Sequence, residues 1–304
     1  MHRPAARTRR SLAAGFRVAA HGGSGCSLTR HRRPTITSRI EDPEIDNQQG
    51  RIRVERENAV ATIVFSRVHA HNALTEAMYA ELAAALTEVE VDGTLKALVL
   101  RGEGTQAFTS GTDARYIAGM RTGALGLRYE QGITRLVTRL QQLRIPVLAV
   151  ISGHCYGAGL LLAAASDIRI ATPGSRFGVP VARTMGNCLS ANSIALLRDR
   201  LGSSIVGDML IRSRSYSAAE LAPTGFVNVL SNTEALARDT DDVLDGICNA
   251  APLTIWAAKE TLSRLQRDPH ADCDDIVETV YGSDDFLIGT SAFLARTTPV
   301  WTGR

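Results

Sequence analysis

The chain alternates between two spacings of apolar residues, and these spacings predict strands and helices in turn. Short runs that are apolar throughout, or that alternate with polar residues, have the period of a β-strand. We expect such strands at residues 52–55, 60–65, 95–100, 145–151, 168–171 and 175–179. Longer segments place apolar residues three or four positions apart, which is the period of an amphipathic helix. We expect these helices at residues 74–91, 125–143, 160–166 and 189–201.

Local signals mark where several of these helices begin or end. Thr75 is suited to cap the first of them, because its hydroxyl can accept a hydrogen bond from a free backbone N–H. Pro146 ends the second, and Gly202 is a suitable cap at the end of the fourth. Units of strand, strand and helix therefore fill the chain to about residue 230. The remainder reads only as helices, at residues 233–249, 252–267, 273–281 and 283–295.

Two glycine-containing turns each follow an expected strand. Residues 107–113 read Ala-Phe-Thr-Ser-Gly-Thr-Asp, and residues 153–159 read Gly-His-Cys-Tyr-Gly-Ala-Gly at the start of a helix of small residues. Glycine lets the backbone approach a ligand closely, and the first N–H groups of a helix have no partner within it. Two loops of this kind can direct two backbone N–H donors at one oxygen. The pattern therefore indicates an oxyanion hole.

The charge of the chain is divided unevenly. Residues 1–40 hold nine arginines and no acid, hence +9, whereas the rest holds 25 basic and 31 acidic side chains, hence −6. The basic character therefore belongs to the N-terminal segment and indicates no nucleic-acid-binding face on the folded region. The sequence has no apolar run near the length that a membrane span requires. We therefore expect neither a nucleic-acid nor a membrane partner.

Residues 1–48 are rich in arginine and lack the apolar core of a secretory signal. An unstructured extension, a start codon assigned too far upstream, a mitochondrial-type transit peptide and a nucleic-acid or membrane arm all remain open. Lys96 and Lys259 are the two lysines of the chain against 32 arginines, a bias expected of GC-rich coding. We expect a bacterial cytoplasmic protein, or one of the mitochondrial matrix if the segment is a transit peptide.

The cysteines are odd in number and widely spaced. They form no CxxC pair and no cysteine–histidine spacing typical of a metal site. We therefore expect free thiols in a reducing compartment and no bound metal. The five are Cys26, Cys155, Cys188, Cys248 and Cys273.

Taken in order, the motifs resemble the crotonase superfamily of enoyl-CoA hydratases and isomerases. The central match is Phe108-x-x-Gly111-x-Asp113 followed by Gly153-x-x-x-Gly157-x-Gly159. Further matches are Asn72-Ala73-Leu74, Phe177-Gly178-x-Pro180, residues 215–227, Ala258-Lys259-Glu260 and residues 284–286, so that residues 51–304 are covered. The resemblance implies an α/β fold, a crotonase-like spiral of repeated ββα units with a C-terminal helical trimerisation region. It places the extension at residues 1–48, the spiral core at 49–245 and the oligomerisation region at 246–304.

The resemblance also implies a site for an acyl-CoA substrate, with coenzyme A as part of that substrate and no separate cofactor. The backbone N–H groups of Ser110 and Ala158 are the expected oxyanion donors. A homotrimer, or a hexamer of paired trimers, is the expected assembly. Substrate contacts are expected at His71, Ala73, Gly111, Thr112, Asp113, Gly157, Lys259 and Phe286, where Lys259 and Phe286 would meet the CoA phosphate and adenine.

The sequence departs from the family at the two glutamates that position water for hydration. Leu161 and Val181 stand at those positions, and neither side chain can transfer a proton. Two-glutamate hydration is therefore not expected. An acyl-CoA decarboxylase or isomerase with another acid or base, and an inactive acyl-CoA-binding scaffold, are the alternatives. Substitute polar groups are sought among Asp113, Glu130, His154, Tyr156, Arg183, Asn187, Cys188 and Asn192.

Overall fold

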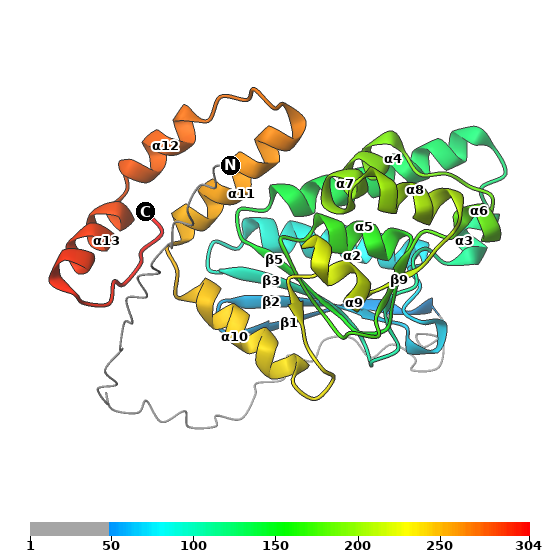
Figure 1. The fold of residues 1–304 in the computed structure, drawn as a ribbon, viewed down its shortest axis with the longest axis horizontal. Helices are drawn as coiled ribbons and strands as arrows, with labels where there is room; N and C mark the ends of the chain where they lie inside the picture. Colours follow the sequence, from blue (N-terminus) through cyan, green and yellow to red (C-terminus); the bar gives the residue numbers. More distant parts are fainter. Residues whose placement is uncertain (1–48) are drawn as a thin grey trace, which may run out of the picture. The chain divides into compact units, whose positions relative to one another are not determined.

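A six-stranded sheet lies at the centre of the fold (Figure 1). The computed structural model describes residues 49–304, so the interpretations of residues 1–48 lie outside the described residues. The first two strands pair antiparallel, and the later neighbours pair parallel. The parallel strands are covered on both faces, which explains their nearly continuous apolar sequences. Across the sheet, the strands are β1 (Arg51–Glu57), β2 (Val60–Ser66), β3 (Ala97–Gly102), β5 (Val147–Ile151), β7 (Ile168–Ala171) and β10 (Val229–Leu230).

A second sheet is built from short strands that alternate along the chain with those of the first. Its strands, in order, are β4 (Ala107–Thr109), β6 (His154–Tyr156), β8 (Arg176–Gly178) and β9 (Tyr216–Ser217). Gly153 makes the crossing from β5 to β6 possible, because its φ is +71° and a Cβ there would lie 1.9 Å from the Gln106 carbonyl oxygen. Helices follow each pair of strands from different sheets. The expected α/β spiral of repeated ββα units is therefore confirmed.

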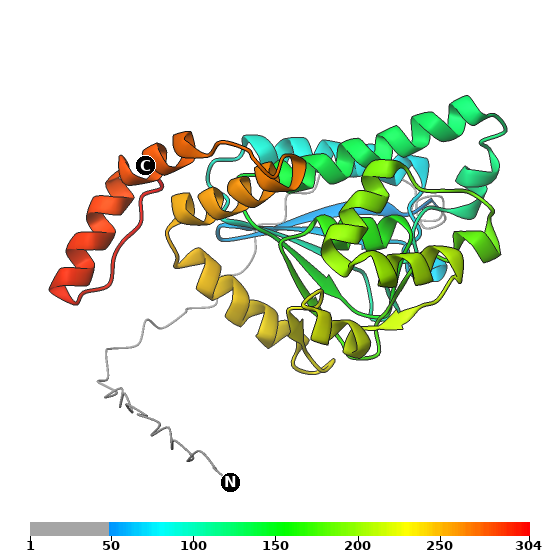
Figure 2. The ribbon, with the colours of Figure 1, turned by 45° about the horizontal axis from the view of Figure 1, so that its top comes forward.

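Helices cover both faces of the six-stranded sheet (Figures 1 and 2). One face carries α2, which packs on β1 and β2, and the other carries α10, which packs on β3 and β7. The helix α5 packs against two short strands of the second sheet, β4 and β6, and against α4. All eight residues of α5 are buried, and all but Gly159 belong to the main hydrophobic core. As expected, Thr75 caps α2 by accepting a hydrogen bond from the Met78 N–H at 3.2 Å. The bounds are α2 (Glu76–Val91), α4 (Gly123–Gln142), α5 (Ala158–Ala165) and α10 (Leu236–Cys248).

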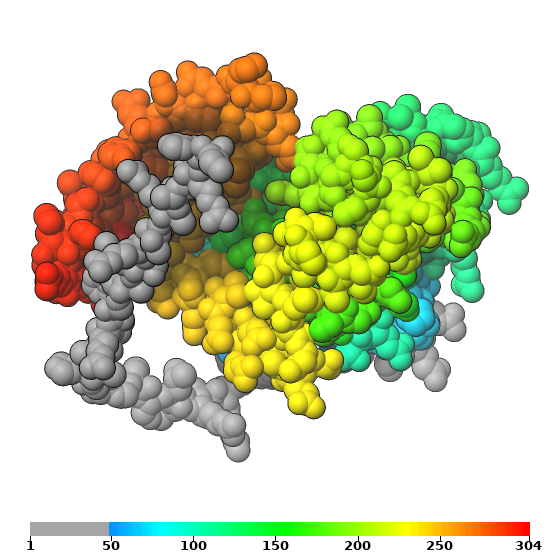
Figure 3. Space-filling model, viewed as in Figure 1, coloured from blue at the N-terminus to red at the C-terminus, as the bar shows by residue number. Residues whose placement is uncertain are grey.

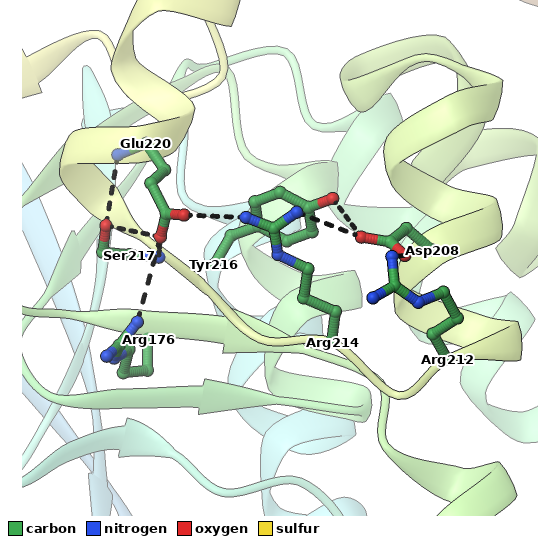
Figure 4. Close-up of polar contacts among 7 residues, drawn as sticks. All are labelled: Arg176, Asp208, Arg212, Arg214, Tyr216, Ser217 and Glu220. Carbon is green, nitrogen blue, oxygen red and sulfur yellow. Dashed lines mark hydrogen bonds and ion pairs between the residues drawn. The ribbon is translucent and has the colours of Figure 1, made fainter.

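Shorter helices form the walls beside α4 and α5. A network of side chains joins α8 to α9 (Figure 4): Arg214 reaches Asp208 at 3.4 Å and Glu220 at 3.1 Å, and the Tyr216 hydroxyl donates to Asp208 at 2.7 Å. Because α6 packs on α8, this network also holds α6 in place. These elements are η1 (Val68–Ala70), α3 (Ala114–Ala118), α6 (Val181–Thr184), α7 (Ala191–Leu201), α8 (Ser203–Ile211), α9 (Ala218–Leu221) and η2 (Ala222–Thr224).

Three helices end the chain on the opposite side of the core from α3 and α6 (Figure 1). They are α11 (Pro252–Arg267), α12 (Asp274–Tyr281) and α13 (Asp284–Ala295). Their orange and red residues gather along one side of the space-filling view (Figure 3). The terminal segment returns along α13, where the Trp301 ring fills the space beside Gly289 and its Nε1 donates to the Asn249 carbonyl at 2.9 Å. The expected boundary between residues 245 and 246 falls within α10.

Within residues 49–304, no helix combines the length and the apolar composition that crossing a bilayer would require. The same residues contain no group of three or more His, Cys, Asp or Glu side chains close enough to share a metal ion. Cys155, Cys188, Cys248 and Cys273 are free thiols, whereas Cys26 lies outside the described residues.

Candidate active site

The two glycine turns lie directly against each other. Gly111 has a φ of +98°, and a Cβ at this position would lie 2.8 Å from the Tyr156 carbonyl oxygen and 3.4 Å from the Ala158 nitrogen. Such a contact leaves no room for a side chain, which explains the glycine. The sequence expectation that both loops serve one site therefore has a geometric basis in the backbone contact.

Among the residues of these loops that line the cavity, two have a backbone N–H with no acceptor among the described residues. One belongs to Ala158, the first residue of α5, and the other to Thr112. Both residues line one cavity of about 240 Å³. The Ser110 N–H, in contrast, donates to the His71 carbonyl oxygen at 3.0 Å and is not available to a ligand. The expected use of the Ser110 N–H therefore does not fit this structure, in which the free N–H groups beside the cavity include those of Thr112 and Ala158.

Thr112 is fixed by the hydroxyl groups of two half-buried tyrosines. Its Oγ1 lies 2.6 Å from the Tyr79 hydroxyl and 2.5 Å from the Tyr129 hydroxyl. Burial raises the pKa of Tyr79 well above its usual value and raises that of Tyr129 as well, so both hydroxyls stay protonated at neutral pH. The rings of Tyr79, Tyr116 and Tyr129 also contact one another, with centroids 6.1–6.4 Å apart. The threonine is thus held by directional bonds in a packed aromatic cluster.

Asp113 stabilises the same loop and does not face the cavity. Its carboxylate accepts from the Arg115 N–H at 2.7 Å, which caps α3, and from Arg67 Nη1 at 2.6 Å. Burial opposes ionisation of Asp113, but these bonds and the charge of Arg67 outweigh it and lower its pKa. Asp113 therefore stays ionised and paired, which fits a structural role better than proton transfer.

The two positions at which the sequence resemblance places glutamates both line the cavity. Leu161 comes from α5 and Val181 from α6, and both present only aliphatic groups to it. Neither can activate water.

Glu130 is the one carboxylate among the described residues that line the cavity. It comes from α4 and is half-buried. The Ser190 N–H donates to its Oε2 at 2.7 Å. Burial raises the pKa of Glu130, and the Ser190 bond only partly offsets this effect. A carboxyl group with a raised pKa is a better proton acceptor than an ordinary one, which suits it to take up and return a proton.

His71, which follows η1, and His154, the first residue of β6, contact each other. His71, with a φ of +51°, makes an edge contact with His154 at 5.4 Å, and His154 stacks on Tyr156 at 5.5 Å. Burial and the neighbouring His71 lower the pKa of His154. The Ala73 carbonyl oxygen accepts from Arg67 Nη1 at 3.3 Å. These contacts place His71 and Ala73 beside the first glycine turn, residues 107–113. Tyr156 and Gly157 line the cavity itself.

The structure gives Lys259 a different role from the expected phosphate contact. Its Nζ donates to Asp167 Oδ2 at 2.7 Å and to the carbonyl oxygens of Ile145 and Leu140 at 3.0 and 3.2 Å. An ammonium group has three donors, so this set uses all of them. Burial lowers the pKa of Lys259 against the opposing effect of Asp167. We therefore correct the assignment: in this arrangement Lys259 ties α11 to the core.

Phe286 lies away from the cavity within one chain. It is on α13, where its ring contacts Tyr281 with centroids 4.8 Å apart, on the far side of the core from α3 and α6 (Figure 1). A contact of Phe286 with a substrate in the site of another copy stays a prediction.

The other polar candidates from residues 183–192 lie either in the cavity wall or at the surface. Asn187 lines the cavity, whereas Cys188 is exposed and does not. Arg183 lines a separate hollow with Arg212 and Arg214 and donates to the Arg212 carbonyl oxygen at 3.4 Å.

The comparison with known proteins agrees with this geometry. The sequence model of the family described as "Enoyl-CoA hydratase/isomerase" matches residues 55–304. The chain is 27% identical over 217 residues to a short-chain-enoyl-CoA hydratase of Clostridium acetobutylicum, covering 69% of this chain and 80% of that protein. It is 27% identical over 254 residues to a carnitinyl-CoA dehydratase of Proteus mirabilis, covering 81% and 96%.

Solved structures give the same result. An enoyl-CoA hydratase/carnithine racemase from Magnetospirillum magneticum superposes with a TM-score of 0.78 at 28% identity, covering 83% of this chain and 96% of that one. An enoyl-CoA hydratase from Bacillus anthracis gives 0.75 at 26% identity, covering 83% and 99%. The chain therefore belongs to the enoyl-CoA hydratase/isomerase family of the crotonase superfamily, as its glycine turns predict.

Proposed function

We propose that the protein catalyses proton transfer on an acyl-CoA thioester through an enolate, with Thr112 and Ala158 as oxyanion donors and Glu130 as the acid and base. The observation that carries this proposal is the meeting of two unpaired backbone N–H groups and a single carboxyl group in one cavity. Coenzyme A enters as part of the substrate, and no other cofactor is required.

The reaction follows from the charge that these groups stabilise. Glu130 removes a proton from the α-carbon, and the electron pair of that C–H bond moves onto the thioester oxygen. The N–H groups of Thr112 and Ala158 stabilise this oxygen, each by about 3 kcal/mol in the transition state. Return of the proton to the γ-carbon of an unsaturated acyl chain shifts the double bond and restores the carboxylate. A double-bond isomerase therefore needs one base only.

Hydration is less well supported, because it needs a second group to position water. The residues at the two family positions, Leu161 and Val181, are aliphatic. Decarboxylation is also less well supported. None of the described residues that line the cavity is Arg, Lys or His, and Glu130 would repel a substrate carboxylate.

We also propose that residues 246–304 make a homotrimer. The C-terminal helices carry large apolar side chains in water, including Phe293 at 84% and Leu294 at 83% exposed. Apolar groups gathered on one surface are typical of an interface. A trimer would also give α13, with Phe286, access to the site of a neighbour.

The test uses the purified full chain with a β,γ-unsaturated acyl-CoA, with crotonyl-CoA, and with coenzyme A binding followed by calorimetry. We expect isomerisation without substantial hydration, and its loss in Glu130→Gln with binding retained. Robust hydration would show that another group positions water. Binding of coenzyme A without turnover, in the wild type as in Glu130→Gln, would favour an inactive acyl-CoA-binding scaffold. This is the second candidate function because the residues at positions 161 and 181 are aliphatic.

A further inference from the structure

A hollow lined by arginines lies at the end of α8, apart from the acyl cavity. Its volume is about 580 Å³, and its described lining contains three guanidinium groups and no carboxyl group. One arginine comes from α6, and the other two come from the loop between α8 and β9. Several guanidinium groups around one hollow favour the binding of an anion. The lining residues are Ala182, Arg183, Ile211, Arg212, Ser213, Arg214 and Ser215.

The neighbouring carboxylates orient these arginines without balancing their charge (Figure 4). Asp208 pairs with Arg212 at 2.8 Å and with Arg214 at 3.4 Å. Glu220 pairs with Arg214 at 3.1 Å and with Arg176 at 3.9 Å. Neither carboxylate lines the hollow. The two acids therefore hold three guanidinium groups from outside the hollow and leave one positive charge in excess.

Arg183 adds a guanidinium group that pairs with no carboxylate of residues 49–304. Its Nη2 donates to the Arg212 carbonyl oxygen at 3.4 Å, which is a long hydrogen bond. A guanidinium group has five N–H donors, so most donors of this exposed side chain remain available to a ligand. With Arg183 included, four arginines face two carboxylates, and the excess charge is +2. This charge matches that of a phosphate monoester at neutral pH.

Ser213 supplies a neutral donor in the same wall. Its Oγ is buried and has no hydrogen-bond partner among residues 49–304, although buried hydroxyl groups are nearly always paired. Its backbone N–H has no acceptor among these residues either. The φ of Ser213 is +55°, a conformation that is uncommon for a residue other than glycine. An anion in the hollow would give the hydroxyl group the acceptor that the protein does not provide.

We propose that this hollow binds the phosphate group of a small phosphate monoester other than the CoA substrate, and that α6 transmits the effect of binding to the acyl cavity. Guanidinium groups match the oxygens of phosphate with parallel hydrogen bonds, and a hydroxyl group adds one more donor. A hollow of about 580 Å³ is much larger than a phosphate ion, so it also has room for the organic group of the ester.

The helix α6 borders both the hollow and the acyl cavity. Ala182 and Arg183 line the hollow. Val181 and Thr184, on either side of them, line the cavity. Because α6 packs on α8, an anion bound between Arg183 and Arg212 would join the two helices and fix the position of Val181. Occupancy of the hollow should therefore change the affinity for the acyl group, while free coenzyme A, which has none, should bind as before.

The first experiment measures binding to the hollow. Calorimetry on the full chain compares ribose 5-phosphate, inorganic phosphate and ribose. We expect ribose 5-phosphate to bind more tightly than inorganic phosphate, and ribose, which has no phosphate group, not to bind. An equal or tighter Kd for inorganic phosphate would assign the hollow to the free ion and overturn the monoester. Saturating coenzyme A should leave the Kd of ribose 5-phosphate unchanged, because the two sites are separate.

Two variants and a control test the residues. Arg183→Gln should raise the Kd of ribose 5-phosphate by about tenfold or more, because hydrogen bonds from a charged group are lost. Ser213→Gly should raise it by about fivefold, and glycine readily adopts the positive φ at this position. Arg238→Gln is the matched control, since it removes the same charge from an exposed side chain on α10, outside the hollow. It should bind as the wild type does, and thermal unfolding of each variant should show that it is folded.

The second experiment measures the Kd of crotonyl-CoA with and without saturating ribose 5-phosphate. We expect a change of about fivefold or more, which Arg183→Gln should abolish and which free coenzyme A should not show. An unchanged Kd for crotonyl-CoA would overturn the transmission through α6.

Three results would overturn the site itself. They are equal binding of ribose 5-phosphate and ribose, an unchanged Kd in Arg183→Gln, and displacement of ribose 5-phosphate by coenzyme A. Failure of the wild type to bind crotonyl-CoA would instead contradict the proposed function. The measurements with ribose 5-phosphate do not depend on that function, so the two failures are distinguishable.

Discussion

The hydroxyl groups of Tyr129 and Thr112 lie 2.5 Å apart, and Thr112 also supplies one of the two unpaired backbone N–H groups of the cavity. In the proposed oxyanion site, the tyrosine would therefore act through the side chain of Thr112. Preorganised donors stabilise charge without rearrangement during the reaction, so their fixation affects rate more than substrate binding. Tyr129 also lines the cavity, so the same residue both bounds the proposed acyl site and holds the Thr112 side chain.

Tyr129→Phe should lower kcat several-fold and leave KM nearly unchanged. The substitution removes one hydrogen bond to Thr112, of about 1 kcal/mol, while Tyr79 keeps its own bond at 2.6 Å. Tyr116→Phe is the matched control, because its ring belongs to the same cluster and its hydroxyl bonds to no described residue. Steady-state kinetics on the preferred acyl-CoA checks both variants. Equal kcat values for the two would show that the hydroxyl of Tyr129 does not position Thr112.

Ala158→Pro should lower kcat by about two to three orders of magnitude, because it removes one of the two oxyanion N–H groups. Ala158 is the first residue of α5, a position where proline is well tolerated because the N–H has no helical acceptor. Ala158→Gly keeps the N–H and should retain most of the activity. The comparison needs single-turnover rates and a thermal unfolding curve for each variant. Retained activity in the proline variant would remove Ala158 from the oxyanion site.

The rate should rise with pH as Glu130 loses its proton, and the midpoint should lie above the usual pKa of a carboxyl group, since burial raises the pKa of Glu130. Glu130→Gln should abolish turnover and, with it, this limb of the pH profile. Glu88→Gln, a change to a carboxylate on α2 outside the cavity, should leave the profile unchanged. A midpoint at the ordinary carboxyl pKa in the wild type would contradict the role of Glu130.

The same pKa also predicts how stability depends on pH. A raised pKa in the folded state means that the native protein binds the Glu130 proton more tightly than the unfolded chain does. This contribution to the free energy of unfolding is present at low pH and is lost as pH rises from the usual carboxyl pKa through the raised one. Glu130→Gln should remove this dependence and make the protein more stable than the wild type at neutral pH. Denaturant titrations of both proteins at several pH values measure the difference, and parallel curves would contradict it.

Much of the fold could be predicted from the sequence because its signals are local. The apolar period predicts α2, α4 and α7, and Thr75 and Gly202 mark helix ends as expected. The strands β4 and β6 have three residues each and lie within the glycine turns, too short for a period to show. The helix α8 was not predicted. Gly202 indicates that α7 ends there, but it does not indicate that another helix begins at the next residue.

The site could be predicted only as far as the two loops. The free N–H groups of the loops are set by acceptors from elsewhere in the chain. The His71 carbonyl oxygen accepts from the Ser110 N–H, whereas the Thr112 N–H has no acceptor among the described residues. Glu130 has no sequence signal of its own, since a carboxylate on an amphipathic helix usually faces water. Its place in the cavity depends on the packing of α4 against α5 and on the Ser190 N–H.

Asp167→Ala should destabilise the protein by about 3 kcal/mol, more than Lys259→Met does. The alanine leaves the buried Lys259 ammonium without its counter-charge and removes the acceptor that binds the Val147 N–H at 2.7 Å. Methionine at position 259 removes the charge itself, while Asp167 stays partly exposed and bonded to Val147. The double variant should be more stable than Asp167→Ala alone. Urea unfolding of the four proteins tests this order, and equal losses in both single variants would contradict it.

The assembly prediction concerns the exposed apolar side chains of α13. Phe293→Asp combined with Leu294→Asp should convert the trimer to a monomer, because two carboxylates would be buried without partners in the interface. Light scattering gives the mass, and Ile211→Asp is the control, since Ile211 is 80% exposed on α8 and outside the proposed interface. If Phe286 reaches a neighbouring site, the monomeric variant should also lose affinity for coenzyme A, while the Ile211 variant keeps it. A wild-type chain that is monomeric at micromolar concentration would reject both the assembly and the shared site. A trimer that survives the double substitution would place the interface on a different surface.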